Sequence, residues 1–175
     1  MSRFSKVLWS SASDEWSTPQ AVFDGLDKEF HFDLDPCATD QNHKCPSYFT
    51  KEQDGLQQSW AGHSVFVNPP YGNVKAWVEK SYLSSLESST LVVLLVPART
   101  DTKWFHEYVT RSRDVRFIRG RLKFGGSNKN NSAPFPSMIV VFGKERGRAL
   151  IPEIRMAKYI GDRRYRLAGE EDDEE

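Results

Sequence analysis

The sequence predicts an α/β fold built on an open, mostly parallel sheet. Segments typical of buried strands alternate along the chain with segments of helical periodicity, which favours parallel strands joined by crossovers. The run from Leu91 to Val96 is continuously aliphatic, as expected of a central strand covered on both faces. A second apolar run, residues 64–67, leads directly into a proline-rich turn. We expect a single domain over residues 1–169 and an acidic, disordered tail over residues 170–175.

The first elements are predicted from caps and periodicity. Thr18 before Pro19 is typical of a helix N-cap followed by proline at the first helical position, and apolar residues at helical spacing follow as far as Phe30. Alternation of apolar and polar residues from Phe30 to Leu34 predicts a strand that ends at Asp35-Pro36. Residues 36–63 are rich in turn-forming residues, with one short apolar piece at Tyr48-Phe49.

The later elements follow the strand at residues 64–67. An amphipathic helix carries Val74, Trp77, Val78 and Tyr82, and a second helix is expected from Thr102 to Arg111. Residues 115–118 and 138–142 are predicted strands, and we expect an antiparallel strand near this C-terminal end of the sheet. Residues 143–169 are basic and weakly periodic, which indicates a helix there.

Composition limits the kind of protein. The chain has 24 basic and 24 acidic residues, but its last six residues are all acidic, so the remainder is basic. The tail is either merely solvated or competes with nucleic acid for the basic body. No apolar run is long enough to span a membrane, no secretory signal is visible, and only two cysteines occur, so we expect a cytoplasmic protein. No obligate protein partner is evident.

The strongest functional signal is the tetrapeptide Asn68-Pro69-Pro70-Tyr71. It follows a buried strand, and ligands of open α/β sheets bind beyond the carboxyl ends of strands. An Asn-Pro turn that only terminates the strand is the alternative. Two stiff prolines that hold an aromatic residue at a strand tip favour a binding role.

The ordered set of motifs around this tetrapeptide resembles the phage-type, Dam-like DNA N6-adenine methyltransferases, and the tetrapeptide itself matches the catalytic motif of amino-directed methyltransferases. The resemblance covers residues 13–143. It implies a Rossmann-like, S-adenosylmethionine-dependent methyltransferase sheet that acts on double-stranded DNA, with a short palindromic site such as GATC. The other matching segments are residues 16–19, 33–38, 54–56, 60, 65–72, 96–101, 104–106 and 120–124.

The chemistry of adenine methylation gives each residue of the tetrapeptide a role. The N6 amine is a poor nucleophile, because its lone pair is delocalised into the ring. Acceptors at the Asn68 side chain and the Pro69 carbonyl would draw the amine toward tetrahedral geometry, which is catalysis by positioning and electrostatic preorganisation. Pro69 and Pro70 keep the carbonyl direction rigid, and Tyr71 offers a ring on which a flipped base can stack.

The cofactor site is expected on the segments before this tetrapeptide. Asp35-Pro36 resembles the family's S-adenosylmethionine motif, although the glycine-rich GxG of many methyltransferases is missing. Too few residues separate Asp35 from Asn68 for two strands with full crossovers, so the sheet is expected to be abbreviated on this side. Cys37, His43 and Cys45 match no common zinc spacing, and we expect no metal. The predicted cofactor-binding residues are Trp16, Thr18, Pro19, Asp35, Pro36, Cys37, Ala38, Asn42, Tyr48 and Asp54.

DNA contacts are expected from a basic segment and the polar loop behind it, residues 111–131. Arginine pairs with guanine, and asparagine with adenine, in the major groove. A solvated charged surface is the plainer alternative. The predicted DNA-binding residues are Arg99, Arg116, Arg119, Arg121, Lys123, Asn128, Lys129 and Asn130.

Two other functions fit the same motifs. The tetrapeptide also serves methyltransferases that act on RNA amines or on protein amides. The chain could instead be a catalytically silent DNA-binding module, although intact Asn68 and Tyr71 disfavour that interpretation.

Overall fold

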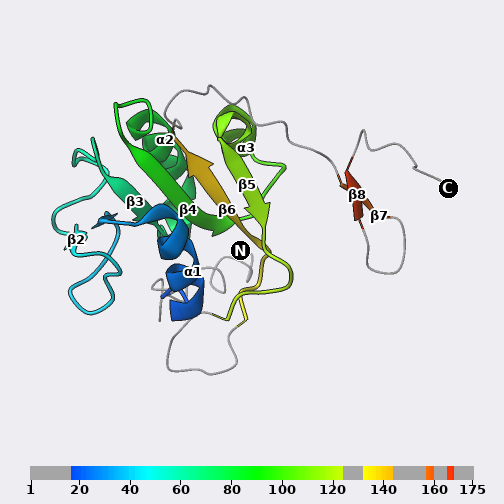
Figure 1. Ribbon diagram of the computed structural model, residues 1–175, viewed down its shortest axis with the longest axis horizontal. Coiled ribbons are helices and arrows are strands. Elements are labelled where there is room, and N and C mark those ends of the chain that lie inside the picture. The colour runs from blue at the N-terminus through cyan, green and yellow to red at the C-terminus, as the bar shows by residue number, and fades with distance from the viewer. Residues whose placement is uncertain (1–16, 124–131, 144–156, 160–164, 168–175) are drawn as a thin grey trace, which may run out of the picture.

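The computed structural model describes residues 17–123 and 132–143, together with the backbone of residues 157–159 and 165–167. Its main sheet has six strands in the order β2-β1-β3-β4-β6-β5 (Figure 1). Strands β1 to β4 run parallel to one another, and β6 is antiparallel to both β4 and β5. The predicted fold class, mostly parallel with an antiparallel strand near the C-terminal end, is confirmed. The strands are β1 (Leu34–Asp35), β2 (Ser47–Tyr48), β3 (Ser64–Val67), β4 (Leu91–Pro97), β5 (Asp114–Phe117) and β6 (Ser137–Phe142).

Helices cover both faces of this sheet (Figure 1). Helix α1 (Gln20–Phe30) packs on one face through Phe23, Leu26 and Phe30. Helices α2 (Val74–Ser84) and α3 (Lys103–Glu107) pack on the other, where Trp77 and Trp104 join its aliphatic side chains. Two short 3-10 helices, η1 (Tyr71–Asn73) and η2 (Val109–Arg111), lie at the ends of these elements.

Alternation along the central strands explains why both faces need a cover. In β4, Val92, Leu94 and Val96 face the α2 layer, whereas Val93 and Leu95 face the α1 layer. All five side chains are fully buried. Successive side chains of a strand point to opposite faces, so a continuous aliphatic run is stable only between two layers.

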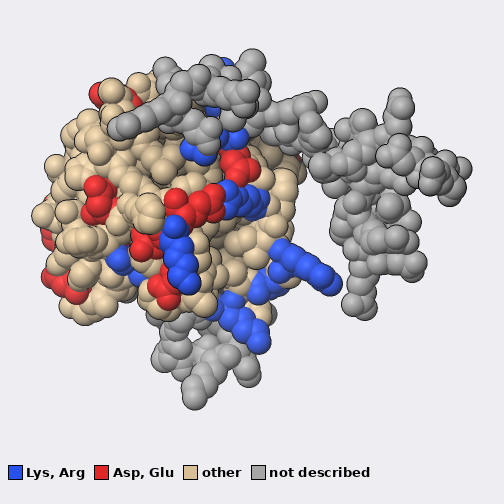
Figure 2. Space-filling view, viewed as in Figure 1, with Lys and Arg blue, Asp and Glu red and all other residues tan. Residues whose placement is uncertain are grey.

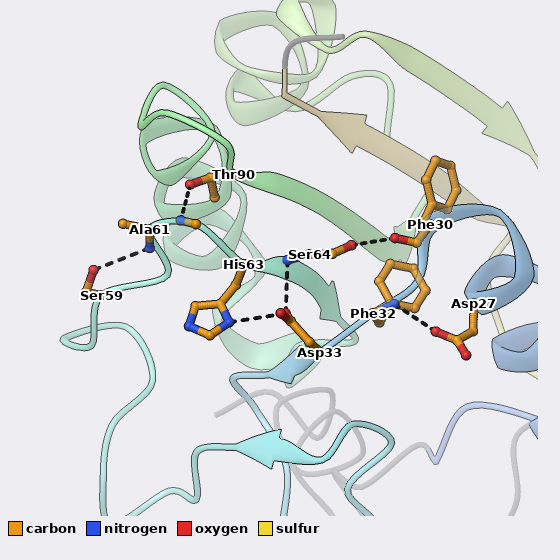
Figure 3. Close-up of polar contacts among 10 residues, drawn as sticks. Asp27, Phe30, Phe32, Asp33, Ser59, Ala61, His63, Ser64 and Thr90 are labelled. Carbon is orange, nitrogen blue, oxygen red and sulfur yellow. Dashed lines mark hydrogen bonds and ion pairs between the residues drawn. The ribbon is translucent and has the colours of Figure 1, made fainter. Parts of the chain in front are cut away.

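Polar contacts at the edge where the parallel strands begin hold β1 in register with β3 (Figure 3). The Asp33 carboxylate accepts the Ser64 backbone N–H at 3.0 Å and lies 3.2 Å from Nδ1 of His63. The Ser64 hydroxyl donates to the Phe30 carbonyl at 2.7 Å, which ties the end of α1 to the start of β3. Because β1 and β3 are held in register at this end, Asp35 and Asn68 lie near each other at the carboxyl ends of the two strands.

The sheet is abbreviated as predicted. Strands β1 and β2 have two residues each. Residues 36–46 and 49–63, which connect β1 to β2 and β2 to β3, form turns without a helix. Because β1 lies between β2 and β3 in the sheet, the loop from β2 to β3 crosses β1.

Three predicted elements are wrong in detail. Phe30 ends α1 instead of starting a strand, because His31 adopts a left-handed conformation with a φ of 52° that stops the helix. Pro19, not Thr18, occupies the N-cap position of α1; its carbonyl accepts the N–H groups of Val22 and Phe23. The helix expected over residues 102–111 breaks at Tyr108, whose φ of −121° leaves the α region, and continues as η2.

The predicted C-terminal helix is also wrong where the structure describes the chain. Residues 157–159 and 165–167 form an antiparallel pair of strands, β7 (Ala157–Tyr159) and β8 (Tyr165–Leu167). The rest of that prediction, and the expected tail over residues 170–175, lie outside the described residues. No helix within the described ranges has the length and apolarity to cross a bilayer.

Candidate functional site

A cavity of about 350 Å³ opens beyond the carboxyl ends of β1 and β3. The chain leaves β1 toward β2 on one side, while β3 lies on the other, so these two strands form the point where the strand order reverses. Ligands of open α/β sheets bind at such a switch point. The volume lies in the range of small-molecule sites. The lining residues are Ser17, Thr18, Asp35, Pro36, Cys37, Ala38, Thr39, Asn42, Lys44, Thr50, Lys51, Asp54, Gly55, Phe66, Asn68, Pro69, Pro70 and Trp77.

Asp35, at the end of β1, is the buried acid of this cavity. One carboxylate oxygen accepts the Lys44 backbone N–H at 3.1 Å, and the other accepts the Cys37 N–H at 3.4 Å. Burial raises the pKa of Asp35, and these two N–H donors oppose that effect. A carboxylate held by backbone donors at a cavity wall keeps its remaining lone pairs for hydroxyl or ammonium groups of a ligand.

The loop between β2 and β3 contributes part of the cavity wall, including Asp54 and Gly55. Gly55 in this loop lies so close to Pro36 that a Cβ atom at position 55 would stand 1.9 Å from the Pro36 carbonyl oxygen. The buried indole of Trp60 donates to the Gly55 carbonyl at 2.9 Å. Asp54, with a φ of 49°, accepts the Leu56 N–H through its side chain, which turns the loop. Only glycine permits this approach, so the Asp54-Gly55 pair has a steric role.

The proline-rich tetrapeptide begins at the other side of the cavity, directly after β3. Asn68, Pro69 and Pro70 all line the cavity that Asp35 lines. The side-chain oxygen of Asn68 is buried. The Cys37 thiol, which the Asn68 backbone N–H faces, has its pKa raised by burial and stays protonated. The site therefore combines a buried carboxylate with an amide at adjacent strand tips.

Tyr71 is half-buried and is not among the residues that line the cavity. Its ring packs edge-to-face on Phe135, with the ring centroids 4.9 Å apart and the planes at 86°. Burial raises the pKa of the Tyr71 phenol, so the hydroxyl stays neutral at physiological pH. Its ring, rather than an ionised oxygen, is the group available for chemistry.

Seven of the ten predicted cofactor residues line the cavity: Thr18, Asp35, Pro36, Cys37, Ala38, Asn42 and Asp54. Pro19 is not in the lining, because it starts α1. Tyr48 is not in it either: its ring stacks on His43 at 4.2 Å and its hydroxyl donates to Asp40 at 2.9 Å. Trp16 lies outside the described residues.

Sequence reasoning missed several lining residues. Trp77 lies on the predicted amphipathic helix, and the structure gives it two roles, since it is buried in the core and lines the cavity. Lys44 and Lys51 bring positive charge to the lining. Their signal in the sequence is weak, because the turns that place them have no periodic pattern.

Four of the predicted DNA-binding residues have exposed side chains: Arg99, Arg119, Arg121 and Lys123. Arg99 follows β4, and the other three follow β5. Figure 2 shows basic side chains gathered past the end of β5. Asn128, Lys129 and Asn130 lie outside the described residues.

Arg116 differs from these four because its guanidinium forms ion pairs with two carboxylates. Its two terminal nitrogens donate to both oxygens of Glu29 at 2.6 Å, and Nε donates to Asp114 at 2.6 Å. The guanidinium also lies over the Phe30 ring, 5.4 Å from the centroid. Arg116 therefore ties α1 to β5.

An abbreviated, mostly parallel α/β sheet with a cavity at its switch point is consistent with a methyltransferase fold. The family model of the DNA N-6-adenine-methyltransferases (Dam) matches residues 5–160. The chain belongs to this family, and the predicted enzyme class, an adenine-specific DNA methyltransferase, is confirmed at that level.

Individual relatives agree with the family model. A DNA N-6-adenine-methyltransferase of Haemophilus phage HP1 is 33% identical over 140 residues, which are 75% of this chain and 80% of the relative. A DNA N-6-adenine-methyltransferase of Escherichia phage T1 is 30% identical over 111 residues, 62% of this chain and 46% of the relative. A putative methyltransferase of Escherichia coli K12, YfdM, is 35% identical over 65 residues, 33% of this chain and 71% of the relative.

Proposed function

We propose that this chain transfers the methyl group of S-adenosylmethionine to the N6 amine of adenine in double-stranded DNA, with the methyl donor in the cavity and the target base at Asn68-Pro69-Pro70-Tyr71. The observation that carries the proposal is the shared cavity: the buried acid after β1 and the amide after β3 line one space. Donor and acceptor sites for a group transfer must be contiguous in this way.

The chemistry of the cavity fits S-adenosylmethionine. This cofactor supplies a methyl group activated on a sulfonium. Asp35 and Asp54 provide acceptors for its hydroxyl or ammonium groups, and Phe66 and Trp77 provide apolar surface for its adenine. Lys44, Lys51 and the Thr18 hydroxyl provide positive charge and a donor for its carboxylate.

Asn68 and the Pro69 carbonyl accept the two N–H groups of the target amine in this proposal, which makes its nitrogen lone pair available for attack. Because the Asn68 side-chain oxygen is buried, this role requires the side chain to turn toward the base when the base enters. Tyr71 stacks on the flipped base. Stacking of about 1–3 kcal/mol offsets the few kcal/mol needed to extrude the base from the duplex.

The exposed cations Arg99, Arg119, Arg121 and Lys123 contact DNA phosphates or base edges in this proposal. Arg116 has a structural role instead, because two carboxylates engage it. A short palindrome such as GATC is the proposed kind of recognition site. Sequencing with modified-base detection, on DNA treated with the purified protein, tests the site; methylated adenines scattered without a common sequence would contradict it.

Asn68→Ala tests the reaction. Transfer of radiolabelled methyl groups from S-adenosylmethionine is measured with unmethylated DNA, RNA and protein as acceptors. We expect label on DNA, and a decrease of about 100-fold or more in Asn68→Ala, the loss typical of one preorganised hydrogen-bonding group in an active site. Asn73→Ala, an exposed asparagine that makes no cap hydrogen bond with α2, is the matched control. Label on RNA or protein but not on DNA would refute the proposed substrate.

A further inference from the structure

The Tyr71 ring has a defined partner in a distant part of the sequence. Phe135 meets it edge-to-face, with centroids 4.9 Å apart and planes at 86°. This geometry places the positive edge of one ring against the negative face of the other, the arrangement that aromatic pairs prefer. Phe135 is only partly buried and packs against the α1-side core, while Tyr71 contacts both core layers. The pair therefore forms the aromatic boundary between the core and the strand tips.

The backbone that carries Phe135 is anchored on two sides. The Ala133 N–H donates to the Leu122 carbonyl at 2.8 Å, and Lys123 forms an isolated antiparallel bridge with Ser132. On the other side, the Ala98 N–H donates to the Pro136 carbonyl at 2.8 Å, directly after β4. Phe135 thus stands between the end of the central strand and the segment of Arg121 and Lys123, and backbone hydrogen bonds hold it from both sides.

We propose that Phe135 is a positioning residue for methyl transfer: its contact sets the orientation of the Tyr71 ring against which the flipped adenine stacks. This inference rests on the proposed function. Phe135 acts through Tyr71 rather than on the reacting atoms. Its loss slows transfer from bound DNA and leaves the binding of cofactor and DNA nearly unchanged.

The backbone hydrogen bond between Ala133 and Leu122 also connects Phe135 to the basic segment. Leu122 lies between Arg121 and Lys123, and it holds the strand segment that presents Phe135. A phosphate bound by either cation is therefore linked to the Tyr71 ring through one backbone hydrogen bond and one aromatic contact.

Phe135→Leu and Phe135→Tyr test the inference in the full chain. The rate of methyl transfer is measured in a single turnover, with enzyme in excess over unmethylated DNA and saturating S-adenosylmethionine. The dissociation constants of DNA and of S-adenosylmethionine are measured separately. We expect Phe135→Leu to lower the single-turnover rate by about 3- to 10-fold, the range that an edge-to-face pair supplies, with both dissociation constants within about twofold. Phe135→Tyr keeps the aromatic ring and retains the wild-type rate.

Phe142→Leu is the matched control for folding. Phe142 is a fully buried phenylalanine of the same strand region, at the far end of β6, where it packs on Tyr82. Its replacement lowers the unfolding temperature and leaves the single-turnover rate unchanged at temperatures where the variant is folded. An unchanged rate in Phe135→Leu, an equal loss in Phe142→Leu, or no recovery in Phe135→Tyr would each overturn the inference. A wild-type protein without transfer to DNA would instead refute the proposed function.

Discussion

At the scale of single residues, Gly55 connects the fold to the site. It sits where the β2–β3 loop meets Pro36, and the missing side chain lets the loop approach Pro36 at the cavity wall. A steric contact of this kind is invisible in the sequence, where Asp54-Gly55 reads only as a turn. Asp35 gives a different case, because its place at a strand end already predicts a binding role.

Gly55→Ala is expected to lower the free energy of unfolding by about 1–3 kcal/mol, the usual cost of overpacking, because its Cβ would overlap the Pro36 carbonyl oxygen. The affinity for S-adenosylmethionine should fall as well, since the loop that lines the cavity must move. Urea unfolding and isothermal calorimetry measure the two effects.

Gly25→Ala is the control for this prediction. Gly25 lies inside α1 with nothing within 4 Å of a Cβ atom, so alanine should stabilise the protein by about 0.5–1 kcal/mol through helix propensity. A tolerated Gly55→Ala, with full cofactor affinity, would show that the loop is not held against Pro36.

At the scale of elements, Arg116 joins α1 to β5 across 87 residues of sequence. We expect Arg116→Gln to lower the free energy of unfolding by about 1 kcal/mol, at the upper end for exposed ion pairs because the contact with Glu29 is bidentate. Arg116 lowers the pKa of Glu29, so this stabilisation is present at neutral pH and is lost as the pH falls through that lowered pKa.

A double-mutant cycle with Glu29→Gln measures the pair directly. Additive losses in the two single variants would mean that Arg116 and Glu29 do not interact in solution. In that case the Arg116 side chain could contact DNA, as predicted from the sequence.

At the scale of the whole molecule, the proposed DNA contacts of the basic side chains past the end of β5 predict a salt-dependent affinity for DNA (Figure 2). Each phosphate contact contributes about 0.9 to the slope of log affinity against log salt. The combined replacement Arg119→Gln and Arg121→Gln should weaken DNA binding and reduce that slope by up to about 2. Fluorescence titrations at several salt concentrations provide the slope.

Arg116→Gln is the comparison, since it removes one cation from the same segment and should leave the proposed DNA surface intact. We expect it to leave the slope unchanged. A slope that falls with Arg116→Gln but not with the Arg119 and Arg121 replacements would place the DNA surface elsewhere.

The sequence by itself determined the reaction class and most of the architecture. Asn68-Pro69-Pro70-Tyr71 after an apolar strand predicts an amino-directed methyltransferase, and strand 64–67 has the predicted bounds. The aliphatic run from Leu91 predicts the central strand. Both predictions succeed because burial patterns and rigid prolines determine local structure over only a few residues. The short spacing from Asp35 to Asn68 likewise predicts the abbreviated sheet.

Tertiary structure alone decided which side chains share the site. Lys44 and Gly55 reach the cavity from turns that no periodicity marks, and the helical periodicity that predicts a buried Trp77 does not show that it lines a cavity. Phe135 lies 64 residues after Tyr71 in the chain, and Arg116 lies 87 residues from Glu29. Such contacts depend on how layers and loops pack. The sequence alone does not show which residue a charged or aromatic side chain will contact in the folded protein.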